Sequence, residues 1–393
     1  MQTKSETAAC MECEQRFCFL AEWPDPYSGI VRHFQLNVYP KDFSVEMYDV
    51  RNNRVFLRRT GCPSLSRREL RIGGKVLVCS RLLSITSYGD TCTARMLHNA
   101  HQKTLAIVKP QAMAKVGTIM EVISEAGLTI TQARMVKFER KHVEDFSARL
   151  QANCCFNEMI NELVSGPALV MELMGKNAVA VWRRFLGFST SEVDENREPD
   201  CAKGDVLNLT NDKIQNLGDQ GYGSLSDEEA VQELDIIFPS TGHHHGPPSA
   251  ARLDNSTCCI IKPHAVSEGL VGKIVNAILE AGFEISALRM LVLEIKEAKE
   301  FLEVYHGVVQ EYKALVTELS TGPCMALEVC GETAVESFRE LCGPWDPEIA
   351  RTLRPKSLRA LFGKDKVHNA LHCTDLPEDG KLEVEYFFKV LSN

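Results

Sequence analysis

Two stretches of the chain are near copies of each other, Thr104-Leu105-Ala106-Ile107-Val108-Lys109-Pro110 and Thr257-Cys258-Cys259-Ile260-Ile261-Lys262-Pro263. In each, an apolar run with the length of a buried strand leads into a lysine and a proline. The two runs lie 153 residues apart. Later matches keep nearly that offset: Glu125-Ala126-Gly127 with Glu280-Ala281-Gly282 at 155, and Ser165-Gly166-Pro167 with Thr321-Gly322-Pro323 at 156. This recurrence indicates two homologous modules in tandem.

Both modules show the same order of expected elements. A buried strand is followed by an amphipathic helix that ends at Gly127 or Gly282, a second strand, further helices, and another strand that begins at Ala168 or Cys324. This order predicts an α+β fold with a ferredoxin-like βαββαβ core in each module. We place the first module at residues 101–239, a linker at 240–254 and the second module at 255–393.

The linker is rich in glycine, proline and serine and contains His243-His244-His245. We interpret these histidines as solvated linker residues rather than as a metal site, because no carboxylate or cysteine joins them.

Residues 1–98 follow a different pattern, typical of a small antiparallel β domain. Strands are expected at 17–20, 33–39, 43–48, 54–57, 75–79 and 82–88, with a turn at Asn52-Asn53. In this strand pattern, residues 8–95 resemble the DM10 domain, a family found in proteins of cilia and flagella. The resemblance implies association with microtubules.

Charge is distributed unevenly along the chain. The formal net charge is −9, but residues 1–99 carry 14 Lys and Arg against 10 Asp and Glu. The excess forms a basic stretch opposed only by Glu69: Arg51, Arg54, Arg58, Arg59, Arg67, Arg68, Arg71, Lys75 and Arg81. Such a stretch favours an acidic partner, although a solvated basic face without a ligand is an equally supported alternative. Nucleic acid is disfavoured because aromatic residues are not interleaved with the cations.

Composition narrows the class of protein further. Hydrophobic residues make up 44% and charged residues 25% of the chain, which excludes wholesale disorder. The 15 cysteines form no paired CxxC set, and no secretory signal or apolar run of membrane-spanning length is found. We therefore expect a reducing cytoplasmic location and no membrane partner.

A candidate site for chemistry lies near the end of the second module. It consists of His368-Asn369-Ala370-Leu371-His372-Cys373-Thr374-Asp375, with Glu383 eleven residues after His372. A lone histidine in such a stretch is more often structural. Three cations elsewhere in the module, Lys262, Arg339 and Arg359, favour phosphate chemistry instead. Cations can hold a triphosphate while a neutral imidazole attacks its terminal phosphorus.

With these residues the repeats resemble the nucleoside diphosphate kinase family. That family is recognised by a strand-ending Lys-Pro, a Ser/Thr-Gly-Pro and an Asn-x-x-His-Gly-Ser-Asp loop, which match Lys262-Pro263, Thr321-Gly322-Pro323 and the loop from Asn369 to Asp375. The resemblance covers about three-quarters of the chain. It implies ping-pong transfer between a nucleoside triphosphate, ATP or GTP, and a nucleoside diphosphate through a phosphohistidine at His372.

The resemblance also assigns the remaining roles. Glu383 would orient His372, and Lys262, supported by Tyr305, would contact the transferred phosphoryl group. Arg339 and Arg359 would bind phosphates, Asn369 the sugar and Tyr312 the base. Mg²⁺ would be the cofactor, held mainly by the nucleotide phosphates, so no protein metal site is expected. Three positions depart from the family pattern and could weaken nucleotide binding: His264, Trp345 and Cys373.

The first module lacks these chemical groups. Its nucleophile position falls on Tyr222, and of the cations only Lys109 and Arg183 persist. A tyrosine with a pKa near 10 cannot replace imidazole as a neutral nucleophile, so we expect no phosphorylation there.

Two functions remain open at this point. The first is a nucleoside diphosphate kinase, active in its second module and placed on the microtubules of the ciliary or flagellar axoneme by residues 1–98. The second is a non-catalytic, microtubule-associated cytoskeletal protein of the axoneme or centrosome that uses the kinase modules as binding bodies. Its partners would be tubulin in axonemal doublets or gamma-tubulin complexes. The two are compatible, and we favour their combination.

Overall fold

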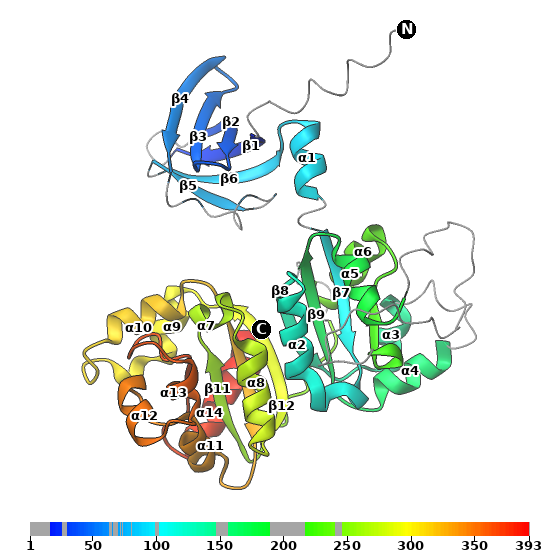
Figure 1. Ribbon diagram of the computed structural model, residues 1–393, viewed down its shortest axis with the longest axis vertical. Coiled ribbons are helices and arrows are strands. Elements are labelled where there is room, and N and C mark those ends of the chain that lie inside the picture. Colours follow the sequence, from blue (N-terminus) through cyan, green and yellow to red (C-terminus); the bar gives the residue numbers. More distant parts are fainter. Residues whose placement is uncertain are drawn as a thin grey trace. The chain divides into compact units, whose positions relative to one another are not determined.

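The computed structural model divides into two compact units, Met1–His101 and Gln102–Asn393, each described here by itself (Figure 1). It describes residues 16–25, 30–62, 65, 70, 72, 74–79, 81–98, 102–146, 156–188, 217–239 and 246–392. Arg67, Arg68 and Arg71 of the basic stretch and His243-His244-His245 of the linker lie outside these ranges.

The N-terminal unit is a six-stranded antiparallel sheet with one helix. Its elements are β1 (Phe17–Pro24), β2 (Val31–Tyr39), β3 (Ser44–Asp49), β4 (Arg54–Gly61), β5 (Lys75–Val78), β6 (Arg81–Tyr88) and α1 (Thr91–His98). The strand order is β4-β3-β2-β1-β6-β5. Alternate residues such as Phe19, Phe34 and Leu36 form the core, as period-2 patterning requires. The expected β domain is confirmed. The sequence patterns did not predict the helix α1. It is joined to β1 by a hydrogen bond of 2.8 Å from the backbone nitrogen of Cys18 to Thr93 Oγ1.

The first module begins the second unit. Its elements are β7 (Gln102–Val108), η3 (Pro110–Lys115), α2 (Val116–Glu125), β8 (Thr129–Val136), α3 (Arg140–Phe146), α4 (Phe156–Val164), β9 (Ala168–Gly175), α5 (Ala178–Phe185), η5 (Gly218–Gln220), β10 (Gly221–Gly223) and α6 (Asp227–Ile237).

The second module repeats this series with extra helices. Its elements are β11 (Ser256–Ile261), α7 (Pro263–Ser267), α8 (Val271–Glu280), β12 (Glu284–Val292), α9 (Ile295–Phe301), η6 (Glu303–Tyr305), α10 (Tyr312–Leu319), β13 (Pro323–Cys330), α11 (Ala334–Cys342), α12 (Pro347–Leu353), α13 (Leu358–Phe362), β14 (Leu371–Cys373), α14 (Gly380–Phe388) and η7 (Val390–Ser392).

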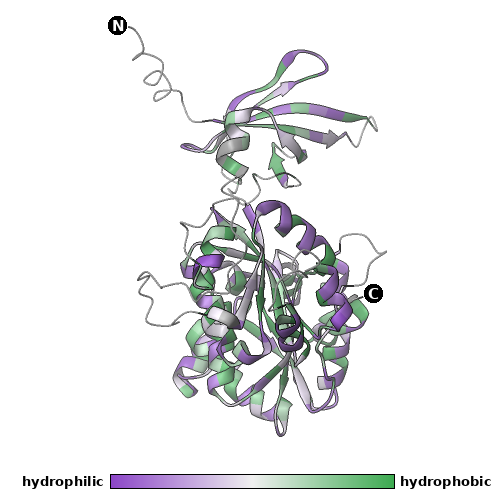
Figure 2. Cartoon of the chain, turned by 90° about the vertical axis from the view of Figure 1, so that its right-hand side faces the viewer, coloured by the Kyte–Doolittle hydropathy of each residue, from purple (hydrophilic) through white to green (hydrophobic). Residues whose placement is uncertain are grey.

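One sheet of eight strands runs through both modules, in the order β10-β7-β9-β8-β12-β13-β11-β14. In each module the first strand lies between the last strand and the third. In the first module β7 lies between β10 and β9, and in the second β11 lies between β14 and β13. This is the strand order of the predicted ferredoxin-like fold. The halves meet at Arg134 of β8, which pairs with Arg289 of β12. Hydrophobic residues concentrate on these strands, whereas hydrophilic residues lie toward the outer helices (Figure 2).

Two glycines allow the modules to pack closely on one face of the shared sheet. A Cβ on Gly117 of α2 would lie 2.7 Å from the backbone nitrogen of Asn276, and one on Gly272 of α8 would lie 2.6 Å from that of Glu121. The Asn276 amide donates to Glu121 Oε1 at 2.9 Å. The core is therefore continuous across the module boundary: it includes Ile119, Met120, Ile123, Ile274, Val275 and Ile278.

None of the helices in the described ranges is long and apolar enough to cross a membrane.

Candidate active site

His372 lies in the centre of the short strand β14, where it pairs with Ile260 of β11. Its ring is 4% exposed, and Nε2 lies 3.0 Å from Oε2 of Glu383 in the first turn of α14. Thr374 Oγ1 donates to the same carboxylate oxygen at 2.9 Å. A carboxylate only accepts, so we assign the imidazole proton to Nε2. Nδ1 then keeps its lone pair.

Lys262 stands at the end of β11, because Pro263 cannot donate to the sheet and suits the first position of α7. Its Nζ donates to the carbonyl oxygen of Val367 at 2.8 Å and to Oδ1 of Asn369 at 2.6 Å. Burial, with help from the nearby Arg359 charge, lowers the pKa of Lys262 to about 7. The resemblance gives Tyr305 a supporting role for Lys262, but the Tyr305 hydroxyl donates to Asp375.

Trp345 lies between two of the predicted cations. Its ring centroid is 5.5 Å from Lys262 Nζ and 5.6 Å from Arg359 Cζ. The carbonyl oxygen of Trp345 also accepts from Asn369 Nδ2 at 3.1 Å. Within the described residues Nε of Arg359 is buried without a hydrogen-bond partner, while its Nη1 donates to Gly343 O at 2.8 Å. Trp345, which departs from the family pattern, therefore contacts Lys262, Arg359 and Asn369.

Arg339 and Tyr305 meet at Asp375. An Arg339 Nη1 lies 3.0 Å from Asp375 Oδ1, and the Tyr305 hydroxyl donates to Oδ2 at 2.5 Å. Burial raises the pKa of Tyr305, as does the hydrogen bond to Asp375, so the hydroxyl stays protonated. The Tyr305 ring lies 6.4 Å from that of His372, which brings this group to the same site. The motif residue Asp375 thus anchors both.

Tyr312, the predicted base-stacking ring, opens α10 and packs edge-on against His306 at 4.9 Å. Phe301 packs more closely on His372 than Tyr305 does, with ring centroids 5.0 Å apart. Phe301 was missed in the sequence because nothing in its local pattern separates it from core residues of α9.

Cys373, which stands where the family usually has glycine, is buried beside Arg359. Arg359 Nη2 lies 3.4 Å from its Sγ. A hydrogen bond with the Cys342 thiol lowers the pKa of Cys373, and the Arg359 charge adds to that effect. The buried Cys373 side chain therefore contacts Arg359, one of the predicted cations, directly.

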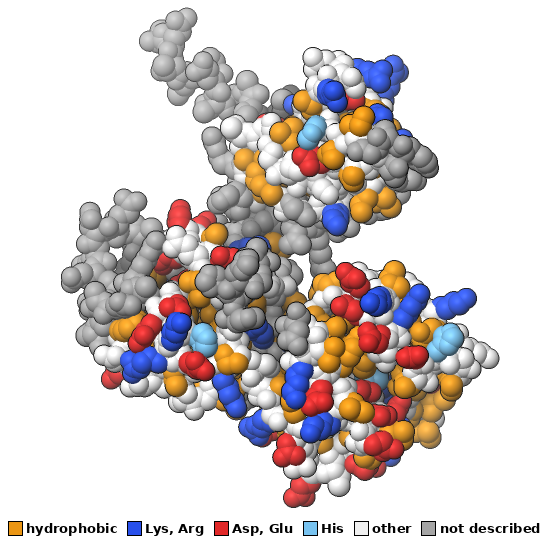
Figure 3. All heavy atoms as spheres, turned by 180° about the vertical axis from the view of Figure 1, so that it is seen from behind, with side chains coloured by type: hydrophobic (Ala, Val, Ile, Leu, Met, Phe, Trp, Pro, Cys, Tyr) orange, Lys and Arg blue, Asp and Glu red, His pale blue; other side chains and the backbone are white. Residues whose placement is uncertain are grey.

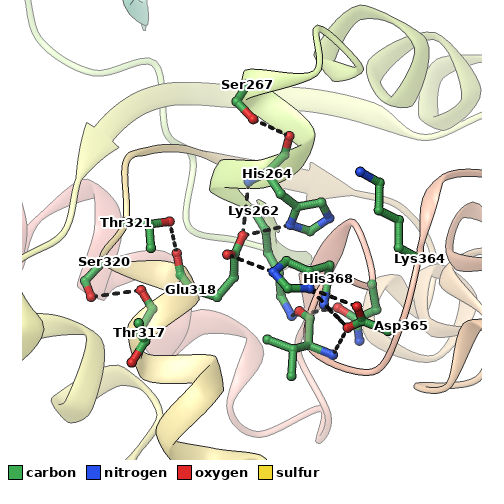
Figure 4. Close-up of polar contacts among 12 residues, drawn as sticks. Lys262, His264, Ser267, Thr317, Glu318, Ser320, Thr321, Lys364, Asp365 and His368 are labelled. Carbon is green, nitrogen blue, oxygen red and sulfur yellow. Dashed lines mark hydrogen bonds and ion pairs between the residues drawn. The ribbon is translucent and has the colours of Figure 1, made fainter. Parts of the chain in front are cut away.

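A second polar cluster adjoins Lys262, and sequence reasoning missed it (Figure 4). Glu318, at the end of α10, accepts from the backbone nitrogen of His264 at 3.0 Å, and its Oε1 lies 2.7 Å from Nδ1 of the same residue. His368 Nε2 lies 3.4 Å from Oε2, and His368 Nδ1 is paired with Asp365 at 2.9 Å. Glu318 lies 54 residues from His264 and 50 residues from His368 in the chain, so no local motif signals these contacts.

The first module places Tyr222 where the second has His372. Tyr222 pairs with Ile107 as His372 pairs with Ile260, and these isoleucines match in the repeat. The Tyr222 hydroxyl donates to Glu233, and Ser224 Oγ donates to the other Glu233 oxygen at 2.6 Å. Burial raises the pKa of Tyr222 well above 10, and the Glu233 charge raises it further. Glu383 and Glu233 occupy matching positions, each eleven residues after its partner. Glu383 bonds the imidazole of His372, and Glu233 bonds the neutral phenol of Tyr222.

No group of three or more His, Cys, Asp or Glu suited to a metal ion is found in the part of the chain that the structure describes.

Comparison with known proteins identifies the lineage of both modules. A profile described as Nucleoside diphosphate kinase matches residues 102–242 and again 255–392. The chain is similar to nucleoside diphosphate kinase homolog 7 of Rattus norvegicus, at 48% identity over 380 residues, which are 96% of this chain and 94% of the relative.

Shorter relatives match one module at a time. The nucleoside diphosphate kinase of Aquifex aeolicus (strain VF5) is 40% identical over 135 residues, 34% of this chain and 94% of the relative. An orthorhombic C222 crystal form of the Aquifex aeolicus enzyme covers 35% of this chain and 97% of its own, at 38% identity and a TM-score of 0.34. Since the family profile matches both repeats and a relative of 48% identity spans nearly the whole chain, this protein belongs to the nucleoside diphosphate kinase family.

Proposed function

We propose that the second module transfers the terminal phosphoryl group of a nucleoside triphosphate, ATP or GTP, to a nucleoside diphosphate through His372. The Nδ1 lone pair attacks the γ-phosphorus, the bond to the β,γ-bridging oxygen breaks, and the diphosphate leaves. A terminal oxygen of the acceptor diphosphate then attacks the phosphorus, and the N–P bond breaks. The observation that supports this most directly is the His372 Nε2–Glu383 contact of 3.0 Å, because it leaves Nδ1 as the free base.

The surrounding cations fit a polyphosphate. Arg359 Nε, which has no acceptor among the described residues, would find one in a phosphate oxygen. Arg339 is 44% exposed at its side chain and can turn toward a ligand. Lys262 would contact the transferred phosphoryl group, where positive charge stabilises the transition state. Asn369 would form a hydrogen bond with a sugar hydroxyl in place of its present bond to Lys262 or to Trp345.

Mg²⁺ is the cofactor we propose, entering with the nucleotide. Asp375, the carboxylate paired with Arg339, also accepts a hydrogen bond from Tyr305. A cluster of cations suits the anionic nucleotide rather than a resident metal, so the phosphates would supply most ligands of Mg²⁺. Bound there, the ion would neutralise charge on the phosphates.

Steady-state exchange between ATP and GDP tests the proposal. The wild type should give the parallel double-reciprocal lines of a ping-pong mechanism, and His372→Ala should lose at least about a thousandfold in kcat. Tyr222→Phe is the matched control, because it changes the same position of the first module and should leave exchange unchanged. Intersecting lines, or exchange that survives in His372→Ala, would contradict a phosphohistidine.

We further propose that the N-terminal unit docks the protein on microtubules of the cilium, flagellum or centrosome through its basic stretch. Arg51, Arg54, Arg58 and Lys75 are exposed, and basic side chains lie on the outer surface of this unit (Figure 3). Arg59 is paired with Asp42 at 3.0 Å and covers Tyr39, and Arg81 stacks over Trp23. The exposed cations support an acidic protein partner such as tubulin, in axonemal doublets or in gamma-tubulin complexes.

Co-sedimentation of the full chain with polymerised tubulin tests this docking. Binding should weaken strongly between about 50 and 200 mM salt, because exposed charges are screened over that range. A triple reversal of Arg51, Arg54 and Arg58 to Glu should abolish binding. Reversing Lys141, Lys273 and Lys296, which are equally exposed in the kinase unit, should not. Binding that resists both salt and the first reversal would remove the electrostatic basis of the proposal.

The non-catalytic alternative is supported by one observation. The first module keeps a complete core and a buried Tyr222–Glu233 pair after losing its nucleophile. A protein that binds microtubules and exchanges no phosphate would establish that alternative.

A further inference from the structure

Each module places a glutamate near its strand-ending lysine, but the two lysines have different partners. Glu162 of α4 and Glu318 of α10 lie 156 residues apart, the same offset as the Ser/Thr-Gly-Pro motifs that follow them. In the first module Lys109 Nζ forms an ion pair with Glu162 Oε2 at 2.6 Å. In the second, Lys262 instead bonds the neutral groups Val367 O and Asn369 Oδ1.

The partner taken by Glu318 explains the difference. Its Oε1 is held by both the backbone nitrogen and the ring Nδ1 of His264, and its Oε2 faces His368. The other ring nitrogen of His264 accepts the backbone N–H of Ala370 at 3.3 Å, next to Asn369. His264 is therefore fixed at both nitrogens, with Nδ1 donating to the carboxylate. Figure 4 shows Glu318 turned toward the two imidazoles.

The matching position of the first module lacks this partner. Lys109-Pro110 is followed by Gln111, whereas Lys262-Pro263 is followed by His264. Where no histidine binds the carboxylate, the glutamate pairs with the lysine. Both lysines are similarly buried, at 7% and 5% exposure, so burial does not explain the choice of partner.

We infer that His264 is a positioning residue that, with His368, holds Glu318 away from Lys262 and so keeps the lysine available for nucleotide phosphate. A lysine paired with a carboxylate presents little net charge to an incoming anion, and the carboxylate would repel it. His264 thus compensates for an acidic residue that the second module retains on α10. Its departure from the family pattern supports phosphate binding rather than weakening it.

Because this inference rests on the proposed kinase function, its test measures nucleotide binding as well as turnover. His264→Gln reproduces the first module and should free Glu318 to pair with Lys262. We expect affinity for Mg·ADP and kcat/KM for exchange to fall by about ten- to a hundredfold, the usual effect of losing one charge-assisted hydrogen bond. The double variant His264→Gln/Glu318→Gln removes the competing carboxylate and should recover to within about threefold of wild type.

Rescue separates positioning from a structural role. If the double variant stays as weak as His264→Gln, or if His264→Gln binds like wild type, the inference is overturned. A wild type that neither binds nor exchanges nucleotide would instead overturn the proposed function. Gln111→His in the first module is the matched control and should leave exchange unchanged.

A second measurement needs no variant. Acylation by acetic anhydride consumes neutral amines, so Lys262 should react at least about ten times faster than the similarly buried, ion-paired Lys109, as mass spectrometry of the modified peptides would show. Equal rates would mean that Lys262, like Lys109, is held protonated in an ion pair with a carboxylate in solution, and the inference would fail even if His264→Gln does not fold.

Discussion

In the imidazole of His372, Nε2 is bonded and Nδ1 has no hydrogen-bond partner among the described residues. Nε2 donates to Oε2 of Glu383, and Thr374 Oγ1 donates to the same oxygen, so two hydrogen bonds hold the carboxylate in place. That arrangement sets the tautomer and would stabilise the cationic ring once Nδ1 carries phosphorus.

Replacing Glu383 by Gln should therefore reduce turnover rather than binding. An amide oxygen still accepts the Nε2 proton but carries no charge, so we expect kcat to fall about ten- to a hundredfold with KM changed less than about threefold. Glu385→Gln, which alters a half-buried carboxylate that is paired with Lys389 on the same helix, is the control for exchange assays. A rise in KM at constant kcat would show that Glu383 acts in binding instead.

The lowered pKa of Lys262 predicts that nucleotide affinity depends on pH. Its pKa of about 7 means that the free protein holds it largely neutral at pH 8. Phosphate favours the charged form, so binding of a nucleoside diphosphate should take up a proton, and affinity should fall as pH rises above 7. Calorimetry at pH 8 in buffers of different ionisation enthalpy measures this uptake. It should vanish in Lys262→Met and persist in the control Lys364→Met, and proton release on binding would contradict the account.

The same depressed pKa affects the stability of the unliganded protein. Lys262 binds a proton more readily when unfolded, where its pKa is near 10.5. Its contribution to the free energy of unfolding therefore declines as pH falls from about 10.5 to 7 and is constant below that.

At the scale of elements, the register of the paired strands shows which residues of the two modules occupy equivalent positions. The Lys-Pro endings predicted β7 and β11 from sequence, and their pairing with β10 and β14 places Tyr222 and His372 at equivalent positions. The motif spacing predicted His372 and Glu383 as partners because both lie within one short stretch, and the two side chains lie 3.0 Å apart. It was not enough for Glu318 with His264 or for Trp345 with Lys262, because these pairs are 54 and 83 residues apart in the chain and no local pattern connects them.

The crossing of α2 and α8 yields a stability prediction. Gly117→Ala would bring a Cβ within 2.7 Å of a backbone nitrogen, so the helices must separate. We expect the free energy of unfolding to fall by about 1–3 kcal/mol in urea denaturation, the usual range for overpacking. Gly322→Ala is the control, because its nearest neighbour, Pro263, is 3.8 Å away. Equal stabilities would show that the modules do not pack through these glycines.

At the scale of the whole molecule, the two kinase modules share a sheet and a core, while the N-terminal unit has a core of its own. Apolar patterning predicted the folds of all three parts, since each follows from local periodicity. It could not predict that Arg134 and Arg289 join the two modules edge to edge. The first module, which has Tyr222 where the second has His372, thus supplies four of the eight strands of the shared sheet.

Calorimetric unfolding should reflect this arrangement. Because the core is continuous across the modules, residues 102–393 should unfold in one cooperative transition, separate from that of the N-terminal unit. Trp182→Ala, which removes a fully buried ring of the first module from the shared core, should lower the Tm of the whole kinase transition. A variant in which only part of that transition shifts would show that the modules unfold independently.

The central claim is that one histidine in one module carries the phosphoryl group. Incubating the purified protein with γ-³²P-labelled ATP and chasing with unlabelled GDP tests it in a single experiment. The account predicts one acid-labile label per chain, discharged by GDP, absent from His372→Ala and unaffected by Tyr222→Phe. A folded wild type that takes up no label, or label that remains in His372→Ala, would contradict it.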